Sequence, residues 1–210
     1  MGPQLPTVYV IDDDREVLKA MQRLLGSVGL SVAAFESPRA FLDTYDAAAP
    51  GCLVLDLAMP ELTGLELQRA LAGRDALLPI VFLTGRGDVR ACAQAMKDGA
   101  VDFLTKPVDA ADLLAAVDQA LAKDRALRQE RAARARVEGS LAALTGRERQ
   151  VLSQIVAGRL NKQIAFELGT VEKTVKFHRG NLMKKLGVRS IADLVRLAER
   201  AGVGAQDTGS

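Results

Sequence analysis

Five short apolar runs alternate with segments of helical periodicity over the first 121 residues of this 210-residue chain. The intervening segments carry apolar residues three or four positions apart, as one face of a helix requires. Strands that are joined through helices in this way form a parallel sheet with both faces covered. We therefore predict a doubly wound α/β domain with five strands, at about residues 8–11, 31–35, 52–56, 79–84 and 101–104.

Helix boundaries follow from capping residues and from the glycines that end the periodic segments. Asp14 suits the start of the first helix and Gly29 its end, while Ser37 followed by Pro38 opens the second. Asp109 is expected to cap the last helix of the domain. The expected helices cover about residues 14–28, 38–48, 64–72, 88–97 and 110–121.

The chain between residues 122 and 143 predicts a charged helical linker. Glycine and proline are absent from residues 110–138, so the preceding helix can continue, and we expect Gly139 and Ser140 to end it. Apolar positions are sparse there among arginines and acids, which is typical of a solvent-exposed or coiled-coil-like helix. We predict three other parts: the α/β domain at 1–121, a small all-α domain at 144–201 and a disordered tail at 202–210.

Four short helices are expected in the C-terminal domain. Thr145 and Glu148 match a capping box for the first, and Asn161 and Ser190 are expected to cap the second and the fourth. The second and third helices, at about residues 162–168 and 171–186, are joined by a turn with Gly169. Two helices joined by such a turn are typical of a helix-turn-helix, here in an all-α four-helix domain.

The two halves of the chain carry opposite charge. Residues 1–121 have 10 Lys and Arg against 17 Asp and Glu, whereas residues 145–201 have 12 against 5. A basic domain that follows an acidic one in the sequence indicates that the C-terminal half binds a polyanion. Chance segregation of surface charge is the alternative.

Cysteine usage and hydropathy indicate a reduced, cytoplasmic protein without a membrane segment. Cys52 and Cys92 fall in an expected strand and an expected helix, where they suit core positions. The N-terminus lacks a secretory signal pattern, and no apolar run approaches 18 residues. With one histidine, the chain has no spacing typical of a His or Cys metal site.

Acidic side chains follow the first and third expected strands. Asp12 and Asp13 come directly after residue 11, and Asp56 ends the strand that precedes Pro60. The carboxyl ends of parallel strands meet at one edge of the sheet, so these carboxylates should gather there. A hard cation such as Mg²⁺ relieves their repulsion, and a carboxylate beside Mg²⁺ can attack a phosphoryl group. Thr84 and Lys106, which follow the fourth and fifth strands, could then contact phosphoryl oxygens.

These segments resemble a response-regulator receiver domain over about residues 6–121. The matching stretches are Val10–Asp14, Leu55–Pro60 with Gly64, Leu83–Gly85 and Phe103–Pro107. The resemblance implies a flavodoxin-like fold in which Asp56 is the phosphoacceptor. It also implies that Mg²⁺ is bound by Asp12, Asp13, Asp56 and the Ala58 carbonyl, that Thr84 and Phe103 form a switch pair, that Lys106 contacts the phosphoryl group, and that Pro107 follows a cis peptide bond.

The basic half resembles the LuxR/FixJ class of helix-turn-helix over about residues 141–200, and the whole chain resembles FixJ-type response regulators. The matching stretches are 144–152, 161–165, 174–179 and 183–186. The resemblance implies that a sensor histidine kinase phosphorylates the chain, that the receivers then form a homodimer, and that the protein binds promoter DNA and contacts RNA polymerase to activate transcription. Release of an inhibited state is the alternative to dimerisation.

Helical spacing sorts the third C-terminal helix into two faces. Val175, His178, Leu182 and Leu186 should pack inward, whereas Lys173, Lys176, Phe177 and Gly180 should enter a DNA major groove. Lys162, Thr174, Lys184 and Lys185 are expected to contact phosphates.

Two other functions remain to be weighed. An aspartyl-nucleophile phosphohydrolase would use Asp56 for turnover, but it usually has a carboxylate two residues later, where this chain has Ala58. A DNA-binding regulator that is indifferent to phosphorylation would be expected to lose Thr84, Lys106 or an acid, and all are present. We therefore expect a regulator and not an enzyme.

Overall fold

The computed structural model describes residues 5–74, 76, 78–85 and 89–202. All of the expected tail at 202–210 except Gly202, and the expected helix start at Asp88, therefore lie outside the described residues. The chain divides into two compact units, residues 1–129 and 130–210. Within the described ranges, every helix is too short or too polar to cross a membrane.

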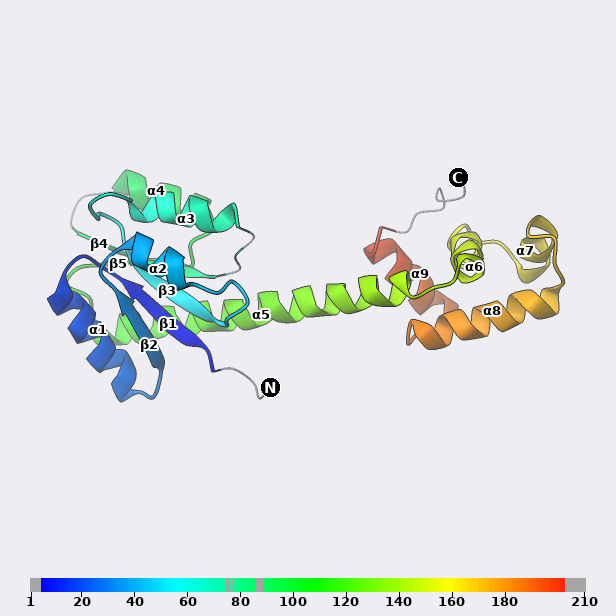
Figure 1. Cartoon of the computed structure of the whole chain (residues 1–210), viewed down its shortest axis with the longest axis horizontal. Helices are drawn as coiled ribbons and strands as arrows, with labels where there is room; N and C mark the ends of the chain where they lie inside the picture. The colour runs from blue at the N-terminus through cyan, green and yellow to red at the C-terminus, as the bar shows by residue number, and fades with distance from the viewer. Residues whose placement is uncertain (1–4, 75, 77, 86–88, 203–210) are drawn as a thin grey trace. The chain divides into compact units, whose positions relative to one another are not determined.

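The first unit is built on the predicted parallel sheet (Figure 1). All neighbouring strands run parallel in the order β2-β1-β3-β4-β5, which confirms the five-stranded doubly wound fold. This order places β3 at the centre, where all six of its residues are buried. The strands are β1 Thr7–Ile11, β2 Ser31–Phe35, β3 Gly51–Asp56, β4 Ile80–Thr84 and β5 Asp102–Thr105.

Helices cover both faces of the sheet, as alternating side chains of a buried strand require. On one face, α1 (Arg15–Ser27) and the first part of α5 (Ala110–Ala142) pack against a core that includes Val10, Val54 and Val117. On the other, α2 (Pro38–Thr44), α3 (Gly64–Ala72) and α4 (Val89–Lys97) lie together in Figure 1, over a core that includes Phe41 and Phe82.

Helix α2 ends at Thr44, so the prediction that it reaches residue 48 was wrong. The backbone is already extended at Tyr45, whose ring packs edge-on against Tyr9 of β1 with centroids 5.7 Å apart. The Asp46 carboxylate then accepts the Ala48 N–H at 2.8 Å and closes a turn. Aromatic packing and this turn together outweigh the local helix preference.

Helix α5 runs to Ala142, so the prediction that Gly139 and Ser140 end it was wrong. A glycine inside a helix costs only about 1 kcal/mol relative to alanine, which neighbouring helical residues can absorb. Two cations instead bind the carbonyls at the helix end: Arg149 donates to Ala142 O at 3.0 Å and Lys185 to Ala143 O at 3.4 Å.

In its described residues, the second unit contains four short helices around its own core, as predicted. Helices α7 and α8 form the helix-turn-helix, with Gly169 in the left-handed region (φ 60°) between them. Leu152, Ile164, Val175, Leu182 and Leu194 are among its core residues. The helices are α6 Gly146–Val156, α7 Asn161–Glu167, α8 Glu172–Lys185 and α9 Ile191–Arg200.

Capping in this unit matches the predictions at three residues and departs from them at one. Thr145 and Glu148 form the expected capping box, and Ser190 Oγ accepts the Asp193 N–H at 3.1 Å. Asn161 does not cap α7, because it is the first helical residue. Its side-chain oxygen accepts a hydrogen bond from Arg179 Nη1 at 2.9 Å, which ties α7 to α8.

Glu148 should make the stability of the C-terminal domain depend on acid pH. Hydrogen bonds from Lys185 (2.7 Å) and from the Thr145 N–H (2.8 Å) lower the pKa of its carboxyl from 4.5 to about 2. A folded-state pKa below the unfolded one adds stability above pH 4.5, and this is lost as the pH falls from 4.5 toward 2. We expect Glu148→Gln to flatten that dependence, as measured by hydrogen exchange of α6 and α8 peptides.

The matched control is Glu138→Gln, which removes a carboxylate from an exposed pair with Arg134 on α5. It should leave the pH dependence of exchange in α6 and α8 as it is in the wild-type chain. If Glu148→Gln retained the wild-type loss of protection below pH 4.5, the assigned role of Glu148 would be incorrect.

Candidate functional sites

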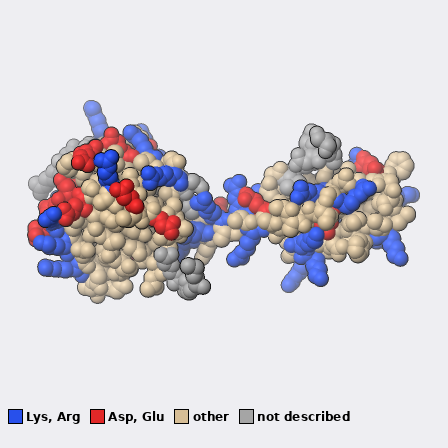
Figure 2. All heavy atoms as spheres, viewed as in Figure 1, with Lys and Arg blue, Asp and Glu red and all other residues tan. Residues whose placement is uncertain are grey.

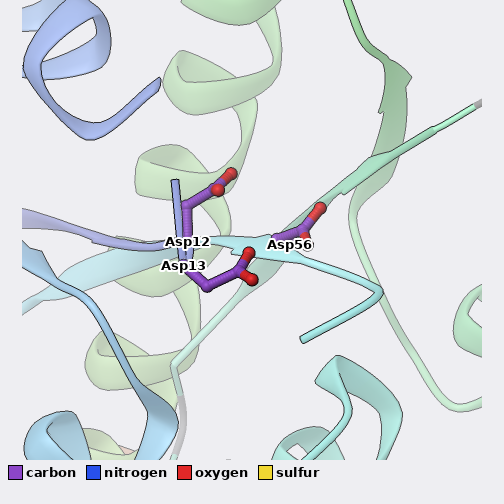
Figure 3. A group of neighbouring side chains, drawn as sticks. All are labelled: Asp12, Asp13 and Asp56. Atoms are coloured by element: carbon purple, nitrogen blue, oxygen red, sulfur yellow. The ribbon is translucent and has the colours of Figure 1, made fainter. Parts of the chain in front are cut away.

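Three carboxylates gather at the carboxyl ends of β1 and β3 (Figure 3). These strands are neighbours, with Ile11 opposite Leu55, so the residues that follow Ile11 lie beside Asp56. Asp12 and Asp56 are buried and Asp13 is exposed, and one oxygen of each lies within 4.8 Å of the others. The sheet thus assembles the acidic cluster that the strand ends predict.

Lys106 supplies a positive charge to this cluster. Its Nζ lies 2.6 Å from Asp12 Oδ2 and 2.9 Å from Asp56 Oδ1. It follows β5, and its backbone N–H donates to Thr84 O at 2.8 Å. The peptide bond between Lys106 and Pro107 is cis. An ammonium group therefore bridges the two buried carboxylates from a segment more than ninety residues after Asp12 in the sequence.

Burial and the ion pairs shift the pKa values of this site in ways that matter for its chemistry. Burial raises the pKa of the Asp56 carboxyl, and the Lys106 ammonium counters part of that rise. Burial alone would lower the pKa of Lys106, but its hydrogen bonds to Asp12 and Asp56 raise it above the usual value. Lys106 thus favours the charged form of Asp56 against the effect of burial.

The remaining predicted receiver residues lie on β4, on β5 and in the turn after β3. Thr84 is buried at the end of β4 and its hydroxyl donates to Gly85 O at 3.0 Å. Phe103 on β5 leaves 42% of its surface exposed, which is high for an aromatic side chain in a strand. Ala58 is exposed in the turn after β3.

Gly64 sets how closely α3 approaches the end of β3, a role that sequence reasoning missed. A Cβ at this position would meet Asp56 O at 2.6 Å and the Phe82 ring at 2.9 Å. Only glycine lets the start of α3 lie directly against the backbone of Asp56. A glycine at the first residue of a predicted helix, just after the Asp56 strand, is the signal that could have revealed it.

The exposed face of α8 carries the side chains predicted to enter DNA. Lys173, Lys176, Phe177 and Gly180 are all exposed, and 64% of the Phe177 surface is accessible. Val175, Leu182 and Leu186 are buried as predicted, whereas His178 is half-buried with its ring against Phe177 (centroids 5.7 Å apart).

The expected phosphate contacts lie in different environments. Lys162 on α7 and Lys184 on α8 are exposed, and Thr174 is half-buried. Lys185 is bound within the domain by Glu148. On the face of this unit in view in Figure 2, Lys and Arg outnumber Asp and Glu, as the composition of residues 145–201 requires.

Comparison with known families supports a function for the acidic cluster of the first unit and for the exposed face of α8. The family model described as "Response regulator receiver domain" matches residues 8–118, and the one described as "Bacterial regulatory proteins, luxR family" matches residues 142–198. The chain therefore belongs to the response regulators that join a receiver to a LuxR-type DNA-binding domain. It is a two-component response regulator that acts in transcription regulation.

Relatives share this organisation over nearly the whole chain. Response regulator protein TmoT of Ectopseudomonas mendocina is 44% identical over 95% of this chain and 91% of its own. Transcriptional regulatory protein FixJ of Azorhizobium caulinodans is 42% identical over 98% and 97%. The solved structure of the response regulator StyR superimposes with a TM-score of 0.86 at 45% identity, covering 93% of this chain and 99% of that one.

Proposed function

We propose that Asp56 accepts a phosphoryl group from a sensor histidine kinase. The observation that carries this proposal is the contact of Asp56 with Lys106 beside two further carboxylates. The carboxylate oxygen of Asp56 attacks phosphorus, a P–O bond forms, and the bond from phosphorus to the kinase's histidine nitrogen breaks. Lys106, freed from part of its pairing with Asp56, then bonds to a phosphoryl oxygen.

Receiver domains bind Mg²⁺ through an acidic pocket, and the donor set of this chain fits that ion. Asp12, Asp13 and Asp56 offer only carboxylate oxygens, which a hard cation prefers, and two of the three are buried where uncompensated charge is costly. These residues, with the Ala58 carbonyl, would hold the ion. When bound, Mg²⁺ neutralises charge on the phosphoryl oxygens.

The phosphoryl group changes the preferred positions of Thr84 and Phe103 in this proposal. The Thr84 hydroxyl, now bonded to the Gly85 carbonyl, turns to a phosphoryl oxygen, and the half-exposed ring of Phe103 moves into the space it leaves. The altered surface of α4 and β5 favours a homodimer. Two DNA-binding domains then occupy two promoter half-sites, which raises the effective affinity, and contact with RNA polymerase activates transcription.

The proposal is tested by the intact mass of the full chain after incubation with acetyl phosphate and Mg²⁺. We expect one added phosphoryl group on the wild type, loss of the adduct in EDTA and no adduct on Asp56→Asn. Asp13→Asn is an informative companion because it removes a ligand but keeps the nucleophile, so its adduct should form slowly. Steady release of phosphate without an adduct would favour the phosphohydrolase alternative, and an adduct on Asp56→Asn would rule out Asp56 as the acceptor.

For DNA, we propose that Lys173, Lys176 and Phe177 enter the major groove, where Lys176 and Phe177 read bases and Gly180 allows close approach. Lys162, Thr174 and Lys184 contact phosphates. Lys176→Ala should weaken binding to a selected promoter fragment by about 10-fold, the range of a single base contact. Lys162→Ala should weaken binding to all DNA sequences alike and reduce the slope of log affinity against log salt concentration by about 0.9. Fluorescence anisotropy at several salt concentrations measures both effects.

The control for the DNA experiment is Lys123→Ala, since Lys123 lies on α5 of the first unit and donates to Gly99 O. It should leave affinity and salt slope unchanged. Equal losses for Lys176→Ala on selected and unrelated sequences would show that Lys176 contacts phosphate and does not read a base.

A further inference from the structure

A buried carboxylate lies far from the phosphorylation site, at the opposite end of the same strand. Asp124 on α5 has 1% of its surface exposed, and its Oδ2 accepts the N–H of Gly51 at 3.1 Å. Gly51 is the first residue of β3, whereas Asp56 is the last. The proposed phosphorylation chemistry makes no use of Asp124.

Arg128 completes this contact one turn further along α5. Its Nε donates to Asp124 Oδ1 at 2.7 Å, its Nη1 donates to Ala48 O at 2.8 Å, and its Nη2 donates to Ala49 O. The two side chains thus bind three backbone groups of the connection that leads from α2 into β3. We call this group of five residues the α5 clamp.

The α5 clamp lies beyond the point at which apolar packing of the helix ends. Leu121 is the last apolar residue of α5 in the receiver core. The next residues, apart from Asp124, Leu127 and Arg128, are exposed up to residue 136. Beyond Leu121, the clamp adds to the bond from Lys123 Nζ to Gly99 O (3.1 Å) in holding the helix to the receiver. The side chains of Asp124 and Arg128 hold about two further turns of α5 against the receiver.

We propose that Asp124 and Arg128 are positioning residues that attach the linker helix to the receiver as far as residue 128, and so give it a fixed starting direction toward the DNA-binding domain. The attachment is a property of the chain with or without phosphate. Its consequence for signalling rests on the proposed function: the change that starts at Asp56 reaches the DNA-binding domain through a helix that cannot bend between residues 121 and 128.

Two variants weaken the clamp to different degrees. Asp124→Asn keeps an acceptor for the Gly51 N–H but removes the charge that holds Arg128, and Arg128→Ala removes all three of its bonds. Arg134→Ala is the matched control, because Arg134 and Glu138 form an exposed Arg–carboxylate pair on the same helix, 2.9 Å apart and, like the clamp pair, four residues apart in the sequence. Circular dichroism checks that each full-length variant is folded. If Arg128→Ala is unfolded, the test is made with Asp124→Asn.

The first measurement is amide hydrogen exchange of the full chain. We expect exchange in peptides covering residues 121–129 to become at least about 10-fold faster in both clamp variants, while Arg134→Ala matches the wild type. Unchanged exchange at these sites in a folded clamp variant would overturn the attachment, whatever the outcome for phosphorylation.

The second measurement is the gain in affinity for a selected promoter fragment when acetyl phosphate and Mg²⁺ are added. The clamp variants should take up the phosphoryl group like the wild type and, when unphosphorylated, should bind the promoter fragment with wild-type affinity. The increase in DNA affinity on phosphorylation should be about five-fold smaller, a typical change in coupling. A full gain despite faster exchange would overturn the signalling role. A wild-type chain that takes up no phosphoryl group would instead refute the proposed function and leave the exchange result to decide the attachment.

Discussion

Replacing Gly51 with alanine is expected to destabilise the receiver by more than about 3 kcal/mol, the upper part of the range for forcing atoms into a packed core. The added Cβ would collide with the carbonyl oxygen of Thr7 and lie 3.1 Å from its carbon. These are backbone atoms of the neighbouring strand, so no rotamer change relieves the collision. Relief requires β1 and β3 to separate where they pair at Thr7 and Gly51.

Urea unfolding of the full chain, followed by circular dichroism and by hydrogen exchange of β1 and β3 peptides, measures this effect. Gly26→Ala is the control, because Gly26 is an exposed residue inside α1 with no atom within 4 Å of an added Cβ. It should stabilise the receiver by about 0.5–1 kcal/mol. A Gly51→Ala receiver as stable as the wild type would mean that β1 and β3 do not approach as closely as described.

Lys106→Met should slow phosphorylation by acetyl phosphate about 100-fold, the size of effect found when one preorganised electrostatic partner is removed. Methionine keeps most of the side-chain length but removes the charge that bonds to Asp12 and Asp56. The Lys106 ammonium lowers the pKa of Asp56 against the effect of burial, so its loss raises that pKa further. The pH dependence of the phosphorylation rate should therefore shift to higher pH, where the Asp56 carboxyl is ionised again.

The measurement is the rate of mass increase at saturating Mg²⁺ over a range of pH. Lys19→Met is the control because it breaks an exposed pair with Glu16 on α1, and it should react at the wild-type rate. A wild-type rate for Lys106→Met would show that its contact with Asp56 is structural and takes no part in phosphoryl transfer.

The sequence by itself determined the architecture of the receiver and the location of its acidic cluster. Short apolar runs between amphipathic helices are local patterns, and a parallel sheet buried on both faces is what they can form. Because parallel strands bring their carboxyl ends to one edge, Asp12, Asp13 and Asp56 could be grouped without coordinates. The two faces of α8 followed from the same kind of local spacing.

Local sequence patterns predicted helix ends and caps less well where contacts with other segments of the chain outweigh local helix preference. Tyr45 ends α2 early, where its ring packs against Tyr9 of β1. Helix α5 continues past Gly139 to carbonyls that Arg149 and Lys185 bind from other helices. Asn161 reads as a helix cap, yet it bonds to Arg179 on α8. In each case the competing partner lies in a segment that sequence periodicity cannot bring into contact.

Only the tertiary structure decided the role of Asp124 and Arg128. An acid and an arginine four residues apart on a polar helix read as an exposed pair, as Arg134 and Glu138 are. Asp124 is buried because β3 begins directly beside it and offers the Gly51 N–H, which needs an acceptor once removed from water. Burial depends on what lies across from a residue, and that is a property of the fold, not of local spacing.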